Sequence, residues 1–389
     1  MCAMNDRTIP VLLLTGYLGS GKTTLVNKIL SNRRGIKFAV IVNDLGEVNI
    51  DADLIQRGGI VEKKDDSLVA LQNGCICCTL KVDLLNQLDD IASKGRFDYI
   101  VIEASGICEP QPIAQTICSI PSLGDKYTSH PYAKLDSIVT VVDALRMQSE
   151  FDCGEGLRRF SLDEDDIENL LIQQIEFCNV ILLNKASEVS AQELGRIKGI
   201  VRAIQPKARI IECDYCEVDF DEILNTGAFD FDKVSLSAAW LGAIEGEHEG
   251  HEHHSHENEE EGEAEEYGIG TFVFQSRKPF DINKFDWFVS KKWPKSIIRA
   301  KGICYFTDEP DHCLLFEQAG KQISMRDIGL WYAAMPEDDL AEMMERESGL
   351  RKDWDPVYGD RMQKIVFIGQ HMDRSAIVSA LEDALAEQK

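Results

Sequence analysis

The sequence lacks an apolar run long enough to cross a membrane. No uninterrupted apolar stretch reaches the roughly 18–20 residues that a membrane-spanning helix needs. The first ten residues, MCAMNDRTIP, contain no apolar region of the kind found in secretory signal peptides. The apolar run that follows, Val11 to Leu14, has only the length of a strand. These absences predict a cytoplasmic protein.

Basic residues are in deficit. Lys and Arg total 41 while Asp and Glu total 67, which gives a formal net charge of −26. A chain this acidic is repelled by the phosphates of nucleic acids and by anionic membrane surfaces. We therefore expect neither nucleic acid nor a membrane among its partners.

Internal repeats are also absent from the 389 residues. At roughly 150 residues per domain, the length suggests two domains, or three at most. Hydrophobic residues make up 44% and charged residues 28%, which is ordinary for a soluble globular protein and excludes wholesale disorder.

The first part of the chain alternates short apolar runs with amphipathic stretches. This alternation predicts an α/β domain with a mostly parallel sheet, because strands covered by helices on both faces are apolar almost throughout. Helices are predicted from Thr23 to about Asn32, and along the apolar positions from Leu80 to Ala92. The predicted strands are Val11–Thr15, Phe38–Val42, Tyr99–Ile102, Ser137–Val142, Val180–Leu183 and Arg209–Glu212.

The composition changes sharply at residues 244–266, which read IEGEHEGHEHHSHENEEEGEAEE. This tract holds eleven Glu, five His and no aromatic residue, so it cannot bury a core and is predicted to be a disordered linker. Aromatic residues return after it. Strands at Gly270–Gln275 and Lys364–Ile368 and a final helix at Arg374–Gln388 predict a smaller α+β domain.

The predicted organisation therefore has three parts. Residues 1–235 form a P-loop NTPase domain with a mostly parallel sheet, and residues 236–266 form an acidic linker rich in His and Glu. Residues 267–389 form the smaller α+β domain.

A phosphate-binding loop follows the first predicted strand. The segment Gly16-Tyr-Leu-Gly-Ser-Gly-Lys-Thr23 fits the pattern GxxxxGK[ST] and lies between a strand and a helix, as that motif requires. Glycines let the backbone turn its N–H groups toward phosphate oxygens, and the helix amino terminus adds its positive dipole end. Lys22 is predicted to contact the β- and γ-phosphates, and the Thr23 hydroxyl a magnesium ion. The predicted binding residues here are Gly16, Gly19, Ser20, Gly21, Lys22, Thr23 and Thr24.

Two later strand ends carry polar residues suited to the same nucleotide. Glu103 ends the predicted strand from Tyr99 and is placed to hold the magnesium shell, while Gly106 can sense the γ-phosphate through its backbone. Asn184, Lys185 and Ser187 resemble the NKxD element of GTPases, with Ser187 where the aspartate usually lies. A hydroxyl cannot offer a bidentate carboxylate to guanine, so guanine is favoured with weakened discrimination against other bases.

Three cysteines, Cys75, Cys77 and Cys78, crowd into the segment NGCICCTL just before a predicted helix. In a reducing compartment such a cluster indicates a metal site or redox thiols. Zinc takes two or three sulfurs and completes a tetrahedron with another ligand, and Cu(I), Co²⁺, Fe²⁺ and Ni²⁺ also suit these ligands. The other nine cysteines are scattered, and we expect them to be small buried residues.

The segment VNDLGEVNID follows the second predicted strand, where a GTPase places its first switch loop. Asp44 and Glu47 are oxygen ligands that suit either Mg²⁺ or the thiolate-bound metal. If either carboxylate contacts the metal, a loop that responds to the γ-phosphate also touches the metal.

The motifs together resemble the CobW-like family of P-loop GTPases, which are relatives of the urease and hydrogenase metallochaperones. The resemblance covers nearly the whole chain apart from the tract 244–266. In the first domain it rests on TGYLGSGKTTL, VNDLGEVNID, NGCICCTL, IEASGICEP, TVVDA and QQIEFCNVILLNKAS. In the second it rests on RKPFDINKF, IRAKGICYF and GDRMQKIVFIGQHMDRSAI.

This resemblance implies GTP hydrolysis coupled to binding of a transition metal, commonly zinc, and its delivery to a client metalloprotein. It assigns Lys22 and Thr23 to phosphate and Mg²⁺ and Asn184 and Lys185 to guanine. It also assigns Cys75, Cys77 and Cys78 to the metal, Zn²⁺ or Co²⁺, and Glu103 to the start of an ExxG element. Three departures from the family pattern are Ser187 in place of Asp, Asp44 where the family often has Glu, and Cys178-Asn179 in place of a common Ala-Asp pair. Analogy adds a nucleotide-dependent homodimer as a candidate assembly.

Two other functions compete with this interpretation. A passive metal-storage protein would use the thiols and the five histidines of the tract, His248, His251, His253, His254 and His256, with a nucleotide site that no longer works. An ATP-dependent small-molecule kinase is favoured only by Ser187.

We interpret the histidine tract as a fast-exchanging metal collector, because a flexible segment loses entropy when a ligand orders it.

Overall fold

The computed structural model describes residues 8–31, 35–42, 68–70, 81–149, 167–230, 268–319, 322–346 and 354–386. The chain divides into two compact units, Met1–Gly154 with Leu170–Ala238, and Glu155–Asn169 with Ala239–Lys389. Each unit contains one β-sheet and its own hydrophobic core. The predicted boundaries of the linker, at residues 236 and 266, lie outside the described residues.

The sheet of the first unit is parallel throughout its described strands, in the order β3-β2-β4-β1-β5-β6-β7. This confirms the predicted α/β class. All six predicted strands are present, several with additional residues, and β3 is a further short strand. The strands are β1 Thr8–Gly16, β2 Phe38–Val42, β3 Leu68–Ala70, β4 Tyr99–Glu103, β5 Tyr132–Asp143, β6 Val180–Asn184 and β7 Arg209–Cys213.

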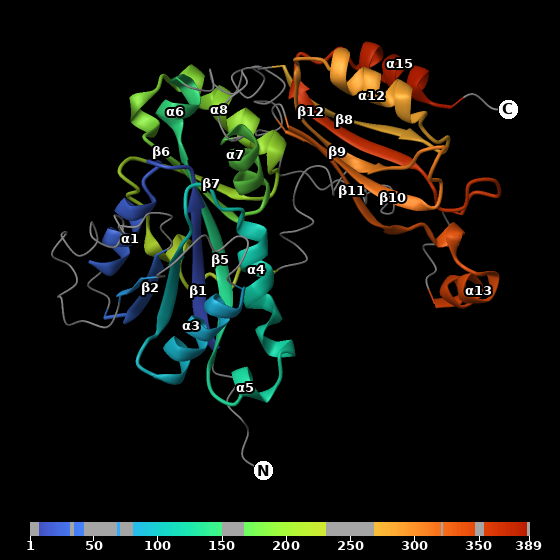
Figure 1. Cartoon of the computed structure of the whole chain (residues 1–389). Helices are drawn as coiled ribbons and strands as arrows, with labels where there is room; N and C mark the ends of the chain where they lie inside the picture. The colour runs from blue at the N-terminus through green and yellow to red at the C-terminus, as the bar shows by residue number, and fades with distance from the viewer. Residues whose placement is uncertain are drawn as a thin grey trace, which may run out of the picture. The chain divides into compact units, whose positions relative to one another are not determined.

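Helices cover both faces of this sheet (Figure 1). Leu12 and Leu14 of β1 pack in one core with Leu25 and Ile29 of the first helix, α1, and the strand's intervening side chains point to the opposite face. The helices are α1 Lys22–Leu30, α3 Lys81–Ser93, α4 Pro110–Ser119, α5 Asp125–Thr128, α6 Ala144–Ser149, α7 Ile167–Glu176 and α8 Ala191–Ile204. Short 3₁₀ turns lie at Ile120–Ser122, Ala186–Glu188 and Phe220–Glu222. The apolar character of β1, β2 and β4 follows from this double covering.

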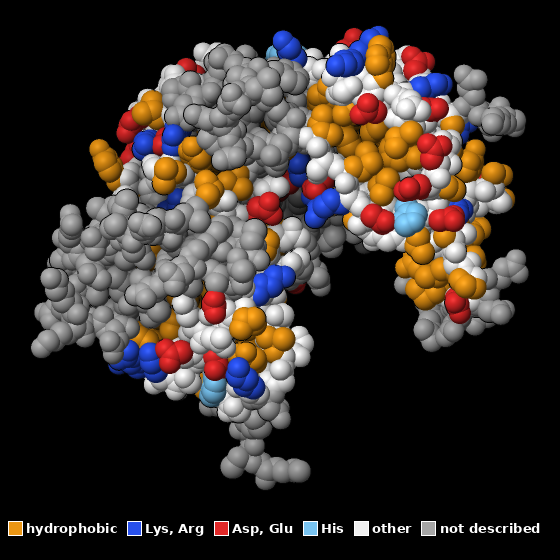
Figure 2. All heavy atoms as spheres, in the orientation of Figure 1, with side chains coloured by type: hydrophobic (Ala, Val, Ile, Leu, Met, Phe, Trp, Pro, Cys, Tyr) orange, Lys and Arg blue, Asp and Glu red, His pale blue; other side chains and the backbone are white. Residues whose placement is uncertain are grey.

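The second unit has a five-stranded antiparallel sheet in the order β11-β10-β9-β12-β8. Phe285 and Phe288 of α12 and Leu381 of α15 enter the same core as the strand residues Phe274 and Phe367, so both helices cover one face of the sheet (Figure 1). Hydrophobic side chains gather on the visible surface of this unit, with charged side chains at their margin (Figure 2). The strands are β8 Ile269–Ser276, β9 Ile297–Cys304, β10 His312–Ala319, β11 Gln322–Leu330 and β12 Gln363–Gln370. The helices are α12 Ile282–Lys291, α13 Glu337–Arg346 and α15 Arg374–Ala384, with a 3₁₀ turn at Tyr332–Ala334.

The final helix ends earlier than the sequence pattern predicts. We expected a helix over Arg374–Gln388, but α15 ends at Ala384. Leu385 forms a β-bridge with Phe280, and the Ala386 N–H donates to the Pro279 carbonyl at 2.9 Å. These tertiary hydrogen bonds replace the next helical turn.

Among the helices that the structure describes, none is long and apolar enough to span a membrane.

Candidate nucleotide-binding site

Backbone shape at the predicted phosphate loop requires glycine. Gly16 has φ 135°, and a Cβ there would lie 2.4 Å from the Val141 carbonyl oxygen of β5. Gly21 has φ 115°, and a Cβ there would lie 2.6 Å from the Asn184 amide nitrogen. Both positive φ angles are disfavoured for other residues. The glycines therefore let the loop pass between β1 and α1 against two neighbouring strands.

Lys22 is buried at the start of α1 and folds back over this loop. Its Nζ donates to the carbonyls of Gly16 at 2.8 Å and Tyr17 at 3.1 Å. These carbonyls hold the ammonium group beside the loop whose N–H groups would face phosphates. Ser20 is buried within the loop, and the side chain of Thr24, in the first turn of α1, is exposed.

Thr23 and Glu103 meet, as expected of a magnesium site. The Thr23 hydroxyl donates to Glu103 Oε1 at 2.8 Å, although the two residues are 80 positions apart. Glu103 ends β4, which pairs with β1, and its side chain is buried. A hydroxyl and a carboxylate are hard oxygen donors of the kind that Mg²⁺ takes.

Gly106 also contacts the phosphate loop. A Cβ at Gly106 would lie 2.6 Å from the backbone nitrogen of Leu18, so the two backbones are in direct contact. The buried side chain of Gln174, in α7, donates to the Gly106 carbonyl at 3.2 Å and to the Cys108 carbonyl at 3.1 Å. Gln174 thus positions the segment after β4, a role that the sequence did not reveal.

Asn184 links the phosphate loop to the loop after β7. Its amide nitrogen donates to the Ser20 carbonyl at 2.8 Å, and its Oδ1 accepts the Cys216 N–H at 2.9 Å. The side chain is buried, at 3% exposure. Such a doubly bonded amide is held in one orientation, which is what recognition of a planar base requires.

Lys185 lies next to Asn184 in the left-handed region, with φ 59°. Its Nζ pairs with the buried carboxylate of Asp143 at 2.6 Å, and the same carboxylate accepts the Arg146 N–H at 3.0 Å. The Arg146 guanidinium lies over the Tyr17 ring at 4.3 Å and donates to the Leu18 carbonyl. Arg146 therefore contacts the phosphate loop directly.

A carboxylate lies beside Ser187, where the NKxD pattern lacks one. Asp214 Oδ1 accepts the backbone N–H of Ser187 at 3.1 Å, from the loop that follows β7. The Ser187 side chain is exposed, and Asp214 is half-buried. A carboxylate from the loop after β7 thus lies beside the position where the sequence has Ser187.

The structure brings the described site residues to one edge of the sheet. In the parallel register Glu103 lies beside Leu14, Asp143 beside Asn184, and Asn184 beside Cys213. The predicted metal residues Asp44, Glu47, Cys75, Cys77 and Cys78 lie outside the described residues. Within the described part of the chain, no group of three or more His, Cys, Asp or Glu side chains could hold a metal.

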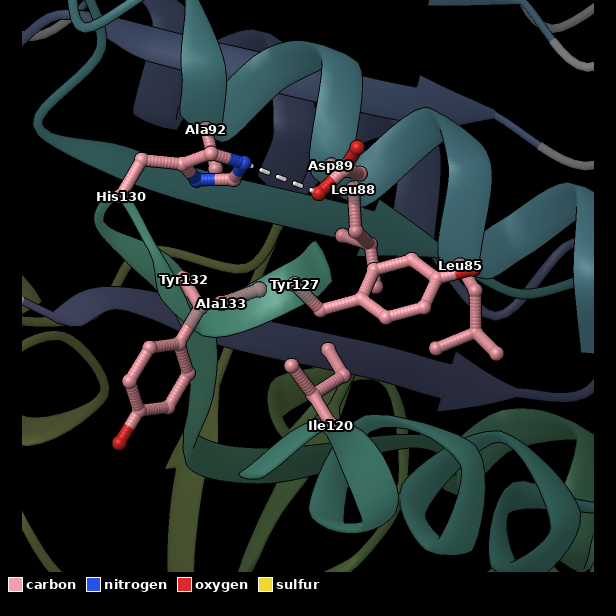
Figure 3. A pocket seen from close by; sticks show the side chains of 9 residues that line it. All are labelled: Leu85, Leu88, Asp89, Ala92, Ile120, Tyr127, His130, Tyr132 and Ala133. Atoms are coloured by element: carbon pink, nitrogen blue, oxygen red, sulfur yellow. Dashed lines mark ion pairs between the residues drawn. The ribbon is translucent and has the colours of Figure 1, made fainter. Parts of the chain in front are cut away.

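A different cavity lies at the opposite edge of the sheet, near the amino end of β5. Figure 3 shows His130 facing Asp89 across it, with Nε2 and Oδ1 3.1 Å apart. Its volume is about 10 Å³, which is room for a single water molecule. This cavity therefore does not compete with the phosphate loop as a ligand site.

Arg146, Gln174 and Asp214 are the site residues that the sequence reading missed. Arg146 lies three residues after Asp143, which ends β5. This spacing could have predicted that Arg146 lies at the site. Gln174 and Asp214 have no motif of their own. The expectation that the scattered cysteines are buried is wrong for the exposed Cys118 and for the half-buried Cys313. It is correct for Cys108, Cys178, Cys213, Cys216 and Cys304.

Family comparison agrees with the two-unit organisation. Residues 10–212 match the CobW/HypB/UreG nucleotide-binding domain, and residues 269–385 match the cobalamin synthesis protein CobW C-terminal domain. The two matches together leave out the His/Glu-rich tract.

Several curated proteins are similar to this chain. The zinc-regulated GTPase metalloprotein activator 1 of Dictyostelium discoideum is 38% identical, over 97% of this chain and 80% of its own length. The zinc chaperone CobW of a Sinorhizobium species is 31% identical, over 57% of this chain and 64% of its own length. The crystal structure of Zn(II)-bound YjiA GTPase from E. coli aligns over 98% of this chain and all of its own, with 21% identity and a TM-score of 0.43.

Proposed function

Because the chain belongs to the CobW/HypB/UreG family of nucleotide-binding proteins, we propose that it is a GTP-hydrolysing metallochaperone. It binds a transition metal, zinc in the first instance, at Cys75, Cys77 and Cys78. It then delivers this metal to a client metalloprotein in a nucleotide-dependent way. The observation that carries the proposal is the meeting of the phosphate loop, Glu103 and Asn184 at one edge of the parallel sheet.

The phosphates of GTP would lie on the loop from Gly16 to Thr23. Backbone N–H groups and the amino terminus of α1 stabilise negative charge there. Lys22 is already held over the loop by two carbonyls, at 2.8 and 3.1 Å, and can exchange these for phosphate oxygens with little movement. Arg146 adds a second cation on the same loop. Together they offset the charge of a triphosphate.

Magnesium would be held by the Thr23 hydroxyl, with Glu103 holding its shell. The two side chains are already within 2.8 Å of each other, so their oxygens converge without rearrangement of β4 or α1. When bound, Mg²⁺ neutralises charge on the phosphate oxygens. Glu103 can also accept a hydrogen bond from a water molecule beside the γ-phosphate, while Gly106 borders the loop next to it.

The guanine base would be recognised by Asn184 and Lys185 together with Asp214. Asn184 is fixed by Ser20 and Cys216, and Lys185 is fixed by Asp143. Asp214 supplies the carboxylate that the Ser187 side chain lacks. A carboxylate can accept two hydrogen bonds from the ring N–H and the exocyclic amine of guanine, whereas adenine offers no such pair of donors.

The metal-binding segment is attached at the nucleotide edge. Strand β3 ends at Ala70 in register with Val42 of β2, and Val42 is in register with Glu103. Cys75 follows Ala70 by five residues, and the segment with Asp44 and Glu47 follows Val42. The ends of β2 and β3, which these segments follow in the sequence, thus lie in register with Glu103. The printed names of two relatives, a zinc-regulated GTPase activator and a zinc chaperone, support zinc as the metal.

The test measures GTP hydrolysis with and without Zn²⁺ or Co²⁺. We expect the metal to change the rate by about fivefold or more, the usual size of coupling between two sites. Cys77→Ala should abolish this response while leaving GTP affinity nearly intact, and the exposed Cys118→Ala is the matched control. A full metal response in Cys77→Ala would refute the coupling.

A further inference from the structure

Two thiols lie together at the base end of the nucleotide site. Cys213 ends β7, and Cys216 follows three residues later in the sequence Cys213-Asp-Tyr-Cys. Their side chains hydrogen-bond to each other, and both are buried, at 6% and 0% exposure. Both are free thiols. The C-x-x-C spacing is one that readily closes into a disulfide.

The turn between the two cysteines brings their side chains to the same side. Tyr215 and Cys216 both adopt left-handed backbone angles, with φ 51° and 54°. Two successive left-handed residues that are not glycine are unusual. This turn exposes the Tyr215 side chain, at 76%, and directs Cys216 inward to Cys213.

The pair contacts the residues that would hold the nucleotide. The Cys213 thiol lies 3.8 Å from Asn184 Oδ1, and the Cys216 N–H donates to the same oxygen at 2.9 Å. The Cys216 thiol lies 3.4 Å from the Gly21 carbonyl, and a Cβ on Gly21 would lie 2.9 Å from its sulfur. Any movement of the two sulfurs therefore changes the contacts of Asn184 and of the phosphate loop.

We propose that Cys213 and Cys216 form a reversible disulfide that weakens nucleotide binding, which makes the base site sensitive to peroxide. The inference rests on the proposed function, because it regulates the same nucleotide site. It is separate from the metal motif at Cys75, Cys77 and Cys78, which shares no residue with it.

The two thiols are unequal, as a reactive pair requires. The hydrogen bond from Cys216 lowers the pKa of Cys213, so Cys213 is the more readily ionised sulfur. The same interaction and burial raise the pKa of Cys216, which stays protonated as the donor. Cys213 is therefore the nucleophile and Cys216 the resolving thiol.

Oxidation by hydrogen peroxide proceeds in two steps. The Cys213 thiolate attacks one peroxide oxygen, the O–O bond breaks, hydroxide leaves, and Cys213 becomes a sulfenic acid. The Cys216 sulfur then attacks the Cys213 sulfur, the S–O bond breaks, and water leaves with the Cys216 proton. In sum the two thiols lose two electrons and peroxide is reduced to two waters. A dithiol reductant reverses the change by thiol–disulfide exchange.

The disulfide removes contacts that fix Asn184. The Cys216 S–H that stabilises the Cys213 sulfur is lost. The Cys216 sulfur also leaves its place 3.4 Å from the Gly21 carbonyl as it bonds to the Cys213 sulfur, which lies 3.8 Å from Asn184 Oδ1. The Cys216 backbone must also shift as its sulfur moves to bonding distance. Loss of one or two ordinary hydrogen bonds corresponds to about three- to tenfold weaker binding of GDP.

The experiment measures GDP affinity of the metal-free full chain before peroxide, after peroxide, and after reduction with dithiothreitol. The same series is run on Cys213→Ser and Cys216→Ser. Cys178→Ser is the matched control, because burial raises the pKa of Cys178 to about 12 and makes it an unreactive thiol. A variant with Cys75, Cys77 and Cys78 changed to Ser separates the pair from the metal motif.

The expected result is a three- to tenfold loss of affinity on oxidation, restored by dithiothreitol, in the native chain, the control and the triple variant. Neither Cys213→Ser nor Cys216→Ser should show the loss. Trypsin releases both cysteines in one peptide, residues 210–233, which should be lighter by two hydrogens after oxidation.

Unchanged affinity on oxidation, or an equal loss in Cys216→Ser, would overturn the inference. So would a tryptic peptide that retains both hydrogens. These outcomes are distinct from failure of the proposed function, in which the reduced protein itself would not bind GDP or hydrolyse GTP. The peptide mass decides whether the disulfide forms in either case.

Discussion

Side chains at the base end of the site are fixed by partners from different strands. Asn184 ends β6 but is held by Ser20 before α1 and by Cys216 after β7. Lys185 is held by Asp143 at the end of β5. The ends of four strands, β1, β5, β6 and β7, thus contribute to a region that the sequence shows as one four-residue motif. Fixed orientation reduces the entropy lost when a base binds.

Asp214 gives the first prediction at this scale. Asp214→Asn should weaken GTP binding by about tenfold, because a hydrogen-bonded carboxylate is stronger than a neutral acceptor. ATP binding should change by less than about threefold, since adenine lacks the two donors. Competition of labelled GTP by unlabelled GTP and ATP measures both affinities.

Glu217→Gln is the matched control for this variant, since it removes the same charge from the same loop, where Glu217 pairs with Lys28. It should leave the preference for guanine unchanged. An equal loss of GTP and ATP affinity in Asp214→Asn would show that the carboxylate acts through general charge or loop structure, and guanine recognition by Asp214 would be rejected.

The strands of the two units position polar and charged side chains in different ways. In the first, parallel strands bring their carboxyl ends to one edge, and loops from that edge carry the polar residues. In the second, the strands are antiparallel, and charged side chains connect β9, β10 and β11. Glu317 of β10 lies 2.5 Å from Lys301 Nζ and 3.5 Å from Arg299 Nη2, while Arg326 of β11 lies 3.0 Å from its other oxygen.

This cluster gives a stability prediction. Burial acts to raise the pKa of Glu317, but Lys301, Arg299 and Arg326 hold it below its ordinary value. A carboxylate with a lowered pKa in the folded state stabilises the fold above its unfolded pKa of about 4.3, and this stabilisation is lost as the pH falls through the folded pKa. Glu317→Gln should therefore lower the free energy of unfolding of the second unit by about 2 kcal/mol at neutral pH.

Urea unfolding followed by tryptophan fluorescence measures this difference. The gap between native protein and variant should shrink as the pH falls below about 4, because the native carboxylate then becomes neutral. Glu309→Gln, at an exposed position, is the control and should change little. A gap that persists undiminished at low pH would show that Glu317 acts through packing and that its charge is unimportant.

The two units have separate hydrophobic cores, and different measurements report the unfolding of each unit. All five tryptophans lie at or beyond Trp240, so tryptophan fluorescence reports the second unit. The phosphate loop, Glu103 and Asn184 all lie in the first unit. Unfolding of each unit can therefore be followed by itself.

GDP at about 100 times its dissociation constant should stabilise the first unit by about 2.7 kcal/mol. In calorimetry the transition of that unit should rise by roughly 5–10 °C. The tryptophan-detected transition should stay where it is. Lys22→Ala should remove the calorimetric shift. If GDP moves both transitions equally in the native chain, the two units unfold as one and the prediction is wrong.

The sequence alone determined the features that depend on neighbouring residues. The phosphate loop, the apolar strands and the break in composition at residues 244–266 are local, because turn geometry, strand burial and charge density are properties of a short segment. The motifs of both domains also identified the family, which the family comparison confirms. Local patterns failed where distant backbone competes, as at the end of α15.

Only the tertiary structure decided which strand ends meet. Asp214 reaches Ser187 across 27 residues, Arg146 reaches Leu18 across 128, and Cys216 reaches Gly21 across 195. These contacts depend on the strand order, in which β5 lies beside β1 and β6 beside β7. A sequence pattern does not specify that order, because many strand orders bury the same apolar residues. The chemistry of the base site is therefore set by the topology of the sheet.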